Sequence, residues 1–209
     1  AVPPGGRVLD VGTGVGAAAL CYAQRVPTAH VSGLELQPTL AELACANVAR
    51  NELTKQVKIL NGDLLAPPEA VSAAGFDQVM ANPPYLPAGR ADPRIAPEKA
   101  ISNVEGEAVL VDWIDFCLRM AAPQGTITLI HRADRLDEIL ARLRGRAGGT
   151  VVFPLWPKRE VAPKRVLVQA RVGIAAPMRI SPGLVLHEPN GSYTDIAANV
   201  LNEGVGLDL

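Results

Sequence analysis

The residues with the most specific chemistry form the tetrapeptide Asn82, Pro83, Pro84 and Tyr85, which directly follows a short apolar run at 76–81. The Asn82 side-chain oxygen and the Pro83 carbonyl can accept hydrogen bonds from both N–H groups of a planar amine. Such contacts would favour a more tetrahedral nitrogen and aim its lone pair at an electrophilic methyl group. Pro84 restricts the preceding backbone, and Tyr85 can stack on a planar substrate. The pattern predicts a site that methylates an amino nitrogen, rather than a simple turn with a packed tyrosine.

A glycine-rich turn follows the first strand that the sequence predicts. The strand at 8–11 leads into Gly12, Gly14 and Gly16, and a helix is predicted over 17–25. Glycines allow a tight turn and a close approach of the backbone to a ligand, and the helix directs its first N–H groups at that ligand. The same pattern is typical of dinucleotide-binding sites, so the turn alone leaves the cofactor open.

Acidic residues follow the turn at successive strand ends. Glu35 lies near the end of a strand at 31–36, and Asp63 follows a strand at 57–60. Glu35 is placed to accept hydrogen bonds from ribose hydroxyls and Asp63 from an adenine amino group, while Asp10 could hold an ammonium or its bridging water. Each acid could be only a solvated strand end or a cap, but their joint occurrence favours S-adenosylmethionine. The residues expected to bind this cofactor are Asp10, Gly12, Thr13, Gly14, Gly16, Glu35, Leu36, Gly62, Asp63, Leu64 and Asn82.

The elements that must position these residues alternate along the chain. Strands are predicted at 8–11, 31–36, 57–60, 76–81, 126–130, 151–156 and 166–172, with helices at 17–25, from Pro38 onward, at 109–118 and at 134–144. This alternation predicts a doubly wound α/β fold with a mostly parallel, seven-stranded, Rossmann-like sheet and an antiparallel terminal hairpin. We expect one domain over 1–209, in which the hairpin at 151–172 and the tail at 180–209 belong to the same sheet. The proline-rich segment 86–104 is expected to border the substrate.

The charge distribution is uneven although the net charge is only −1. Residues 119–179 hold 12 Lys and Arg against 4 Asp and Glu. A cationic lobe is typical of a polyanion partner, although a solvated Arg-rich helix face has the same composition. Four basic residues flank the expected tip of the terminal hairpin, and these candidate RNA contacts are Lys158, Arg159, Lys164 and Arg165. A charged sheet edge that resists aggregation is the alternative interpretation.

Several other classes of protein are disfavoured. The cysteines Cys21, Cys45 and Cys117 are far apart in apolar contexts, which predicts buried, reduced thiols rather than a disulfide framework or a zinc site. His131 is interpreted as structural, and no metal is expected. The chain lacks a long apolar run and a secretory signal, so a cytoplasmic location without membrane insertion is predicted. The sequence begins without Met immediately before its first strand, and a segment upstream is expected to be removed or not represented.

These motifs resemble those of class I S-adenosylmethionine-dependent methyltransferases that act on amino nitrogens. The stretches that carry this resemblance are 8–20, 33–38, 62–65 and 82–85. Within that group, the chain resembles the bacterial tRNA(Val) adenine-N6 methyltransferases at 80–89, 103–112, 129–135, 164–170, 184–188 and Tyr193-Thr194. The resemblance implies that Gly12, Gly14, Glu35 and Asp63 bind the cofactor and that 82–85 receives an adenine near the anticodon. It also implies an amino-terminal segment before the first strand that helps to cover the cofactor and receive RNA.

Other substrates remain open at this point. Asn-Pro-Pro-Tyr also occurs in enzymes that resemble release-factor glutamine-N5, rRNA guanine-N2 and DNA adenine methyltransferases. The basic segment favours RNA, and tRNA in particular by the resemblance. A cofactor-binding RNA module without catalytic activity is the alternative of another class, and Asn82 argues against it because binding alone needs no amine clamp.

Overall fold

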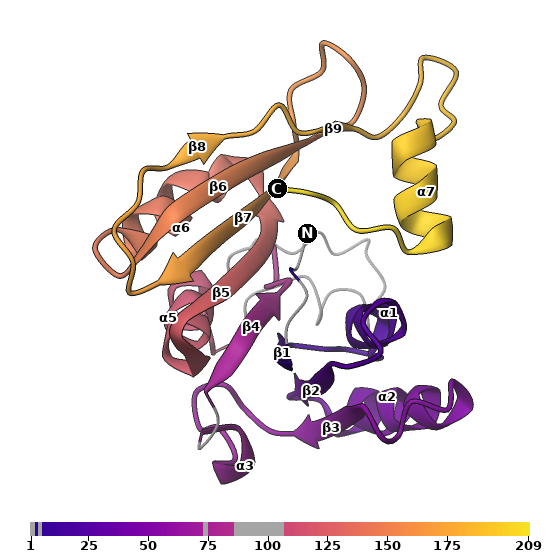
Figure 1. Ribbon diagram of the computed structural model, residues 1–209, viewed down its shortest axis with the longest axis vertical. Coiled ribbons are helices and arrows are strands. Elements are labelled where there is room, and N and C mark those ends of the chain that lie inside the picture. The colour runs from indigo at the N-terminus through magenta and orange to yellow at the C-terminus, as the bar shows by residue number, and fades with distance from the viewer. Residues whose placement is uncertain (1–2, 4–5, 73–74, 86–106) are drawn as a thin grey trace.

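Figure 1 shows the chain as a computed structural model, which describes residue 3 and residues 6–72, 75–85 and 107–209. One twisted sheet runs through the described residues, with the strand order β3-β2-β1-β4-β5-β7-β6-β8, and β9 also pairs with β6. The strands are β1 (Arg7–Val11), β2 (His30–Glu35), β3 (Val57–Asn61), β4 (Phe76–Ala81), β5 (Ala121–Arg132), β6 (Ala147–Trp156), β7 (Arg165–Val172), β8 (Arg179–Ile180) and β9 (Leu184–Val185). The helices are α1 (Ala17–Arg25), α2 (Pro38–Arg50), α3 (Glu69–Ser72), α5 (Leu110–Met120), the 3-10 turn η1 (Ala133–Arg135), α6 (Leu136–Leu143) and α7 (Asp195–Glu203).

The pairing confirms a doubly wound, mostly parallel sheet with an antiparallel hairpin. Strands β3, β2, β1, β4 and β5 pair in parallel, whereas β7 is antiparallel to both β5 and β6. The count of seven strands was slightly low, because β8 and β9 add two strands of two residues each. Such short strands carry no period-2 signal. They flank β6, so the hairpin is not the outermost part of this edge.

The two faces of the sheet are covered by different helices. Leu9, Val79 and Ile127 pack under α5 and α6, whose Ile114 and Ile139 are fully buried. The alternate residues of the strands face α1 and α2, and beyond β5 they face α7 and the tail (Figure 1). This alternation follows from the period of two along a strand.

One strand boundary differs from the sequence-based expectation. Strand β5 begins at Ala121, earlier than the predicted 126, and runs through Pro123. The register shifts between Phe76 and Gln78 of β4, and Gln124 adopts a positive φ of 64°. A bulge therefore accommodates the segment that the sequence predicted to be only a turn.

The prediction that all cysteines are buried is wrong for two of them. Cys21 and Cys45 are exposed, and Cys117 is buried. The buried residues of α1 are Ala19, Tyr22 and Ala23, so Cys21 lies off the stripe that packs on the sheet. An apolar sequence context therefore did not distinguish the inner from the outer face of a short helix. Burial raises the pKa of the Cys117 thiol to about 12, which keeps it protonated.

Candidate functional site: a pocket at the carboxyl edge of the sheet

The glycine turn after β1 is fixed to the end of β2 by backbone hydrogen bonds. The Gly12 and Thr13 N–H groups both donate to the Leu34 carbonyl, at 2.8 and 3.0 Å. Gly12 and Gly14 have φ of 69° and 57°, in the left-handed region that favours glycine. The Gly14 N–H donates to Glu35 Oε2 at 2.8 Å. The sequence-predicted turn and acid are thus in direct contact.

Glu35 is nearly inaccessible, with 6% of its surface exposed, and both its carboxylate oxygens accept backbone N–H groups. Its second partner is the Gln37 N–H, which donates to Oε1 at 2.9 Å. An ionised carboxylate has about four acceptor positions, so these two bonds leave acceptor capacity for hydroxyl groups of a ligand. Glu35 therefore has a structural role in the turn as well as a place in the pocket.

Asp63 follows β3 at the same edge. Its Oδ1 accepts the Leu65 N–H at 2.8 Å, and the adjacent Gly62 N–H donates to the Glu35 carbonyl at 2.9 Å. The side chain is half-buried. The local turn geometry thus positions the carboxylate beside the end of β2.

These strand ends enclose a cavity of about 360 Å³, a size typical of small-molecule sites. Its lining residues are Val11, Gly12, Gly14, Leu34, Glu35, Leu36, Gln37, Leu40, Gly62, Asp63, Leu64, Asn82, Pro84, Glu107, Ala108 and Trp113. Eight of the residues predicted to bind the cofactor thus surround one cavity. Asp10, Thr13 and Gly16 are buried and do not line it.

Asp10 lies inside the turn rather than at the cavity wall. The Thr13 hydroxyl donates to Asp10 Oδ2 at 2.6 Å. Burial raises the pKa of Asp10 to about 6, although the Thr13 hydrogen bond and a backbone hydrogen bond partly oppose that shift. The geometry gives this carboxyl a role in shaping the turn.

Trp113 is a part of the pocket that the sequence did not reveal. Its apolar spacing predicted only a core-facing stripe of α5. A Cβ added at Gly12 would lie 2.5 Å from Trp113 Cη2, so the indole closes the pocket against the turn. The Trp113 Nε1 is buried and finds no hydrogen-bond acceptor among the described residues.

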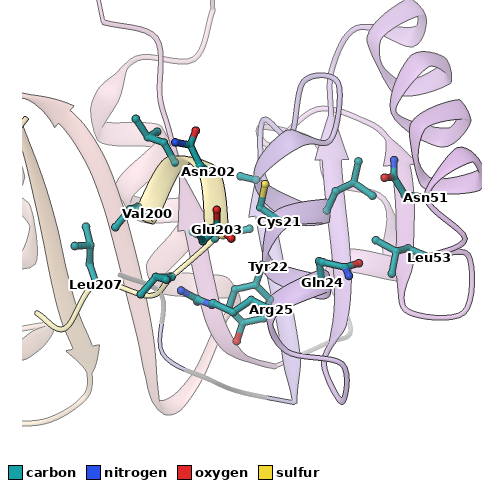
Figure 2. A pocket seen from close by; sticks show the side chains of 16 residues that line it. Cys21, Tyr22, Gln24, Arg25, Asn51, Leu53, Val200, Asn202, Glu203 and Leu207 are labelled. Carbon is teal, nitrogen blue, oxygen red and sulfur yellow. The ribbon is translucent and has the colours of Figure 1, made fainter. Parts of the chain in front are cut away.

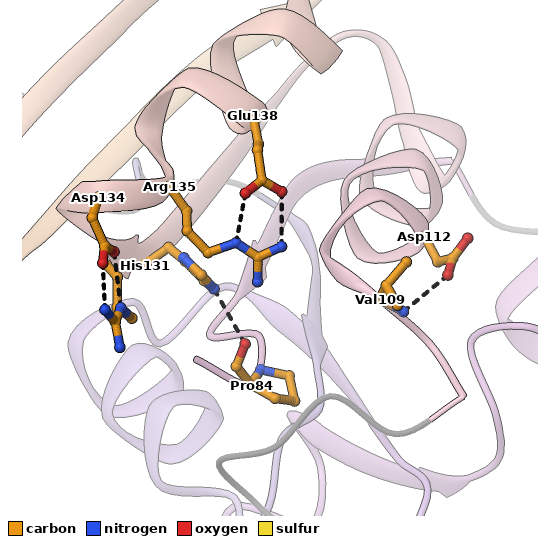
Figure 3. A network of polar contacts seen from close by, with 8 residues as sticks. Pro84, Val109, Asp112, His131, Asp134, Arg135 and Glu138 are labelled. Carbon is orange, nitrogen blue, oxygen red and sulfur yellow. Dashed lines mark hydrogen bonds and ion pairs between the residues drawn. The ribbon is translucent and has the colours of Figure 1, made fainter. Parts of the chain in front are cut away.

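The tetrapeptide after β4 contributes to the wall of the cavity. Asn82 and Pro84 line it, and the Tyr85 hydroxyl donates to Asn82 Oδ1 at 2.6 Å. The His131 ring, from the end of β5, is fully buried, and its Nε2–H donates to the Pro84 carbonyl at 3.2 Å. Figure 3 shows His131 directed at Pro84. His131 is thus structural, as predicted, but its partner belongs to the candidate site.

The Tyr85 ring is held between two side chains from neighbouring strands. His131 meets it edge-on, with the ring centroids 5.6 Å apart and the planes at 62°. The Arg165 guanidinium lies over it, 5.1 Å from the centroid. Arg165 is the first residue of β7 and pairs with Arg132 at the end of β5. One residue predicted to contact RNA therefore touches the predicted catalytic tetrapeptide.

Two ion pairs surround His131 at this edge of the sheet (Figure 3). Arg132 pairs with Asp134, and Arg135 pairs with Glu138 at 2.7 Å. Hydrogen bonds from these guanidinium groups hold the pKa of Asp134 and of Glu138 below the usual values. Asp134 and Glu138 therefore each have a cationic partner beside the candidate site.

The other three candidate RNA contacts lie between β6 and β7. Lys158, Arg159 and Lys164 are exposed, and Lys158 Nζ donates to the Pro189 carbonyl at 3.1 Å. The structure brings this loop beside the tail, while Arg165 alone reaches the tetrapeptide. The segment 86–104, predicted to border the substrate, lies outside the described residues.

A second cavity, of about 810 Å³, lies between α1 and the end of α7 (Figure 2). Tyr22, Arg25, Glu203 and Leu207 are among the residues that surround it. None of the predicted site residues lines this cavity, so its larger size does not make it the candidate site. In the described ranges, no cluster of three His, Cys, Asp or Glu is arranged to hold a metal, and no helix has the length and apolar character to cross a membrane.

Comparisons with known proteins identify methyltransferases as relatives of this chain. Residues 1–102 match the family described as "Methyltransferase small domain". A tRNA1(Val) (adenine(37)-N6)-methyltransferase from Porphyromonas gingivalis is 31% identical over 193 residues, which cover 89% of this chain and 74% of that protein. A release factor glutamine methyltransferase from Salmonella typhimurium is 34% identical over 144 residues, or 66% of this chain and 50% of that protein.

Among solved structures, the protein Atu636 from Agrobacterium tumefaciens, described as a predicted O-methyltransferase, superposes with a TM-score of 0.75. It is 26% identical, and the match covers 95% of this chain and 88% of that one. The glycine turn, the strand-end acids and the tetrapeptide after β4 thus occur on a fold and in a sequence context shared with methyltransferases. The chain belongs to the family of S-adenosylmethionine-dependent amino-methyltransferases that includes the tRNA1(Val) (adenine(37)-N6)-methyltransferases.

Proposed function

We propose that this protein transfers a methyl group from S-adenosylmethionine to N6 of an adenine in RNA, with tRNA as the substrate class. One observation carries the proposal. Asn82 and Pro84 line the same cavity as Gly12, Gly14 and Glu35, so an amine clamp and a nucleoside-type site share one space. The amine clamp alone or the nucleoside-type site alone does not imply group transfer, whereas their presence around one cavity supports it.

The residues of the pocket fit the cofactor. Glu35 retains acceptor positions for ribose hydroxyls, and one Asp63 oxygen already bonded to Leu65 leaves the other for an adenine amino group. The apolar surfaces of Leu36, Leu64 and Trp113 suit a flat base between them. When bound, S-adenosylmethionine supplies a methyl group on a positively charged sulfur.

The residues of this chain would promote methyl transfer by positioning the substrate amine rather than by acting as a strong base. The lone pair of an exocyclic amine is delocalised into its ring, and no side chain deprotonates such an amine at neutral pH. Hydrogen bonds from the amine to Asn82 Oδ1 and to the Pro83 carbonyl would make its nitrogen more tetrahedral and stabilise the positive charge that develops as the new C–N bond forms. Transfer of the methyl group would leave a positive charge on the substrate nitrogen, which would then release its extra proton to solvent.

Tyr85 and Arg165 favour a nucleobase as the planar group. An adenine that has been swung out of its stack presents a large π surface, which an aromatic side chain can cover. The guanidinium over the Tyr85 ring adds a positive charge where the phosphates of the same nucleotide would approach. A glutamine side chain has neither a flat ring to stack on Tyr85 nor a phosphate to pair with Arg165.

A protein substrate is the second candidate, because the Salmonella relative is named for release factor glutamine methylation. Its match covers 50% of that relative and 66% of this chain, whereas the match with the Porphyromonas enzyme covers 74% of that enzyme and 89% of this chain. We therefore rank RNA above protein.

The test is incubation of the protein with labelled S-adenosylmethionine and separate pools of tRNA, rRNA and release factors. Digestion of the product and mass spectrometry then identify the methylated group. We expect N6-methyladenosine from the tRNA pool. Label in N5-methylglutamine or in N2-methylguanosine alone would contradict the proposal, and cofactor binding without any product would favour a non-catalytic binding module.

A further inference from the structure

The tail contains a pair of stacked aromatic rings, one of them exposed, that the site described above does not use. After β9, His187 and Tyr193 form an isolated antiparallel bridge, and their rings stack with centroids 4.8 Å apart at 26°. Hydrogen bonds from the Glu188 N–H to Ser192 O and from the Gly191 N–H to Glu188 O close the turn between them. Tyr193 remains 51% exposed, so His187 covers only part of its ring.

This turn is fixed beside the basic loop at 157–164. The His187 N–H and its Nδ1–H both donate to the Pro157 carbonyl, each at 3.1 Å. Lys158 Nζ donates to the Pro189 carbonyl at 3.1 Å. The Thr194 hydroxyl donates to the Val185 carbonyl at 2.8 Å, which holds the other end of the turn on β9. The exposed ring is therefore preorganised and does not lie on a free tail.

The charge around the pair suits a polyanion. Lys158, Arg159, Lys164 and Arg165 are exposed, and none of them forms an ion pair with a described carboxylate. The acids on the two loops are Glu160 and Glu188, and Asp195 follows at the start of α7. The loops thus carry a cationic excess next to an exposed aromatic face, a combination that binds single-stranded nucleic acid.

The pair lies along the same sheet edge as the catalytic tetrapeptide. Strand β4 ends at Ala81, and the strands that follow in order are β5, β7, β6 and β9, the last of which pairs Leu184 with Leu155. Four strand spacings correspond to about 19 Å, a distance that several nucleotides span. Arg165 lies between the two places, over Tyr85 and opposite Leu155.

We propose that Tyr193, backed by His187, is a stacking platform for an unpaired base of the RNA substrate, several nucleotides from the methylated adenine. The basic loop holds the intervening phosphates. The platform selects substrates with a single-stranded segment on that side of the target base. This inference rests on the proposed function, because it assumes an RNA substrate.

The test compares Tyr193→Ala, Tyr193→Phe and Met178→Ala. Met178 has the same exposed fraction, 51%, but precedes β8, which pairs with β6 far from its carboxyl end. The probe is a fluorescein-labelled single-stranded RNA of about 12 nucleotides, within the site size of known single-strand binders. Loss of stacking should weaken RNA binding by about tenfold in Tyr193→Ala, because one base stack is worth about 1–3 kcal/mol. Tyr193→Phe and Met178→Ala should bind within about twofold of the unaltered protein.

Each remaining outcome decides between the two proposals. If Tyr193→Ala binds RNA as tightly as the unaltered protein while tRNA methylation persists, the platform is wrong and the proposed function stands. If the unaltered protein binds no RNA and methylates only a release factor, both are wrong. If Tyr193→Ala unfolds, Tyr193→Leu decides, because leucine retains apolar contact with His187 but offers no flat ring, and tight RNA binding by that variant would overturn the platform.

Discussion

The Tyr85 hydroxyl donates a hydrogen bond to the Asn82 side-chain oxygen at 2.6 Å. This hydrogen bond joins the first and last residues of the tetrapeptide, and it occupies one lone pair of the Asn82 oxygen. A carbonyl oxygen has two acceptor positions, so the second can take an N–H of the substrate.

This relationship separates two roles of Tyr85. Tyr85→Phe keeps the ring and loses the hydroxyl, so we expect the rate of methyl transfer to fall by about fivefold, the effect of one neutral hydrogen bond. Tyr85→Ala also loses base stacking, and the KM for RNA should rise by about tenfold in addition. Steady-state kinetics with saturating cofactor measure both effects. Equal KM values for the two variants would show that the ring does not contact the substrate.

His131 acts on the site through the Pro84 carbonyl. His131→Phe removes the N–H donor but keeps a ring beside Tyr85, and we expect kcat to fall by about tenfold because the half-buried Pro84 carbonyl loses its partner. Cofactor affinity should not change. His131→Gln offers a donor at similar reach and should restore part of the rate. If His131→Phe lowers the melting temperature but leaves kcat unchanged, the histidine is structural only.

Gly12 faces the Trp113 indole across the turn. In Gly12→Ala the new Cβ would lie 2.5 Å from the indole, and φ of 69° is strained for alanine, so the turn or the ring must move. We expect the Kd for S-adenosylmethionine, measured by calorimetry, to rise by at least about tenfold, since that shift occurs in the pocket wall. Gly145→Ala is the matched control, because its φ is 75° and its Cβ meets open space. A similar Kd for both variants would show that the close approach of Gly12 to the Trp113 indole does not affect cofactor binding.

Asp10 should make stability depend on pH. Its folded-state pKa, about 6, exceeds the ordinary value of 3.8, because burial disfavours the ionised form. The folded state therefore binds the proton more tightly, and this contribution to stability is complete below pH 3.8 and is lost as pH rises through 6. Asp10→Asn removes the titration and still accepts from Thr13. The melting temperature of the variant relative to the unaltered protein should rise between pH 4 and pH 7, and a constant difference would contradict the assignment.

Local sequence patterns were sufficient to predict the main strands, the glycine turn and the edge of the sheet at which the candidate site lies. Helix α1 begins and ends where the sequence predicted, because the glycine turn and Ala17 mark its start. Glu35 and Asp63 fall at strand ends, and parallel strands carry such residues to a common edge. The tetrapeptide directly follows the apolar run at 76–81, so it was predicted to lie at the same edge of the sheet.

Contacts between segments that are far apart in the sequence could not be predicted from local patterns. His131 and Pro84 are 47 residues apart, and the spacing of neither indicates the hydrogen bond. Trp113 had the spacing of a core residue, and only the packing of α5 on the turn brings it to the pocket. For Cys21 and Cys45, local apolar composition could not replace knowledge of which helix face meets the sheet.

Asn82→Ala tests the central claim most directly, because it removes the proposed amine acceptor from a residue that lines the cavity proposed to hold the cofactor. The measurement pairs calorimetric S-adenosylmethionine binding with the single-turnover rate of methyl transfer to tRNA. We predict a nearly unchanged Kd and a rate lowered by at least about a hundredfold, as expected for a lost transition-state contact. An unchanged rate in this variant would contradict the assignment of methyl transfer to the Asn82–Tyr85 site.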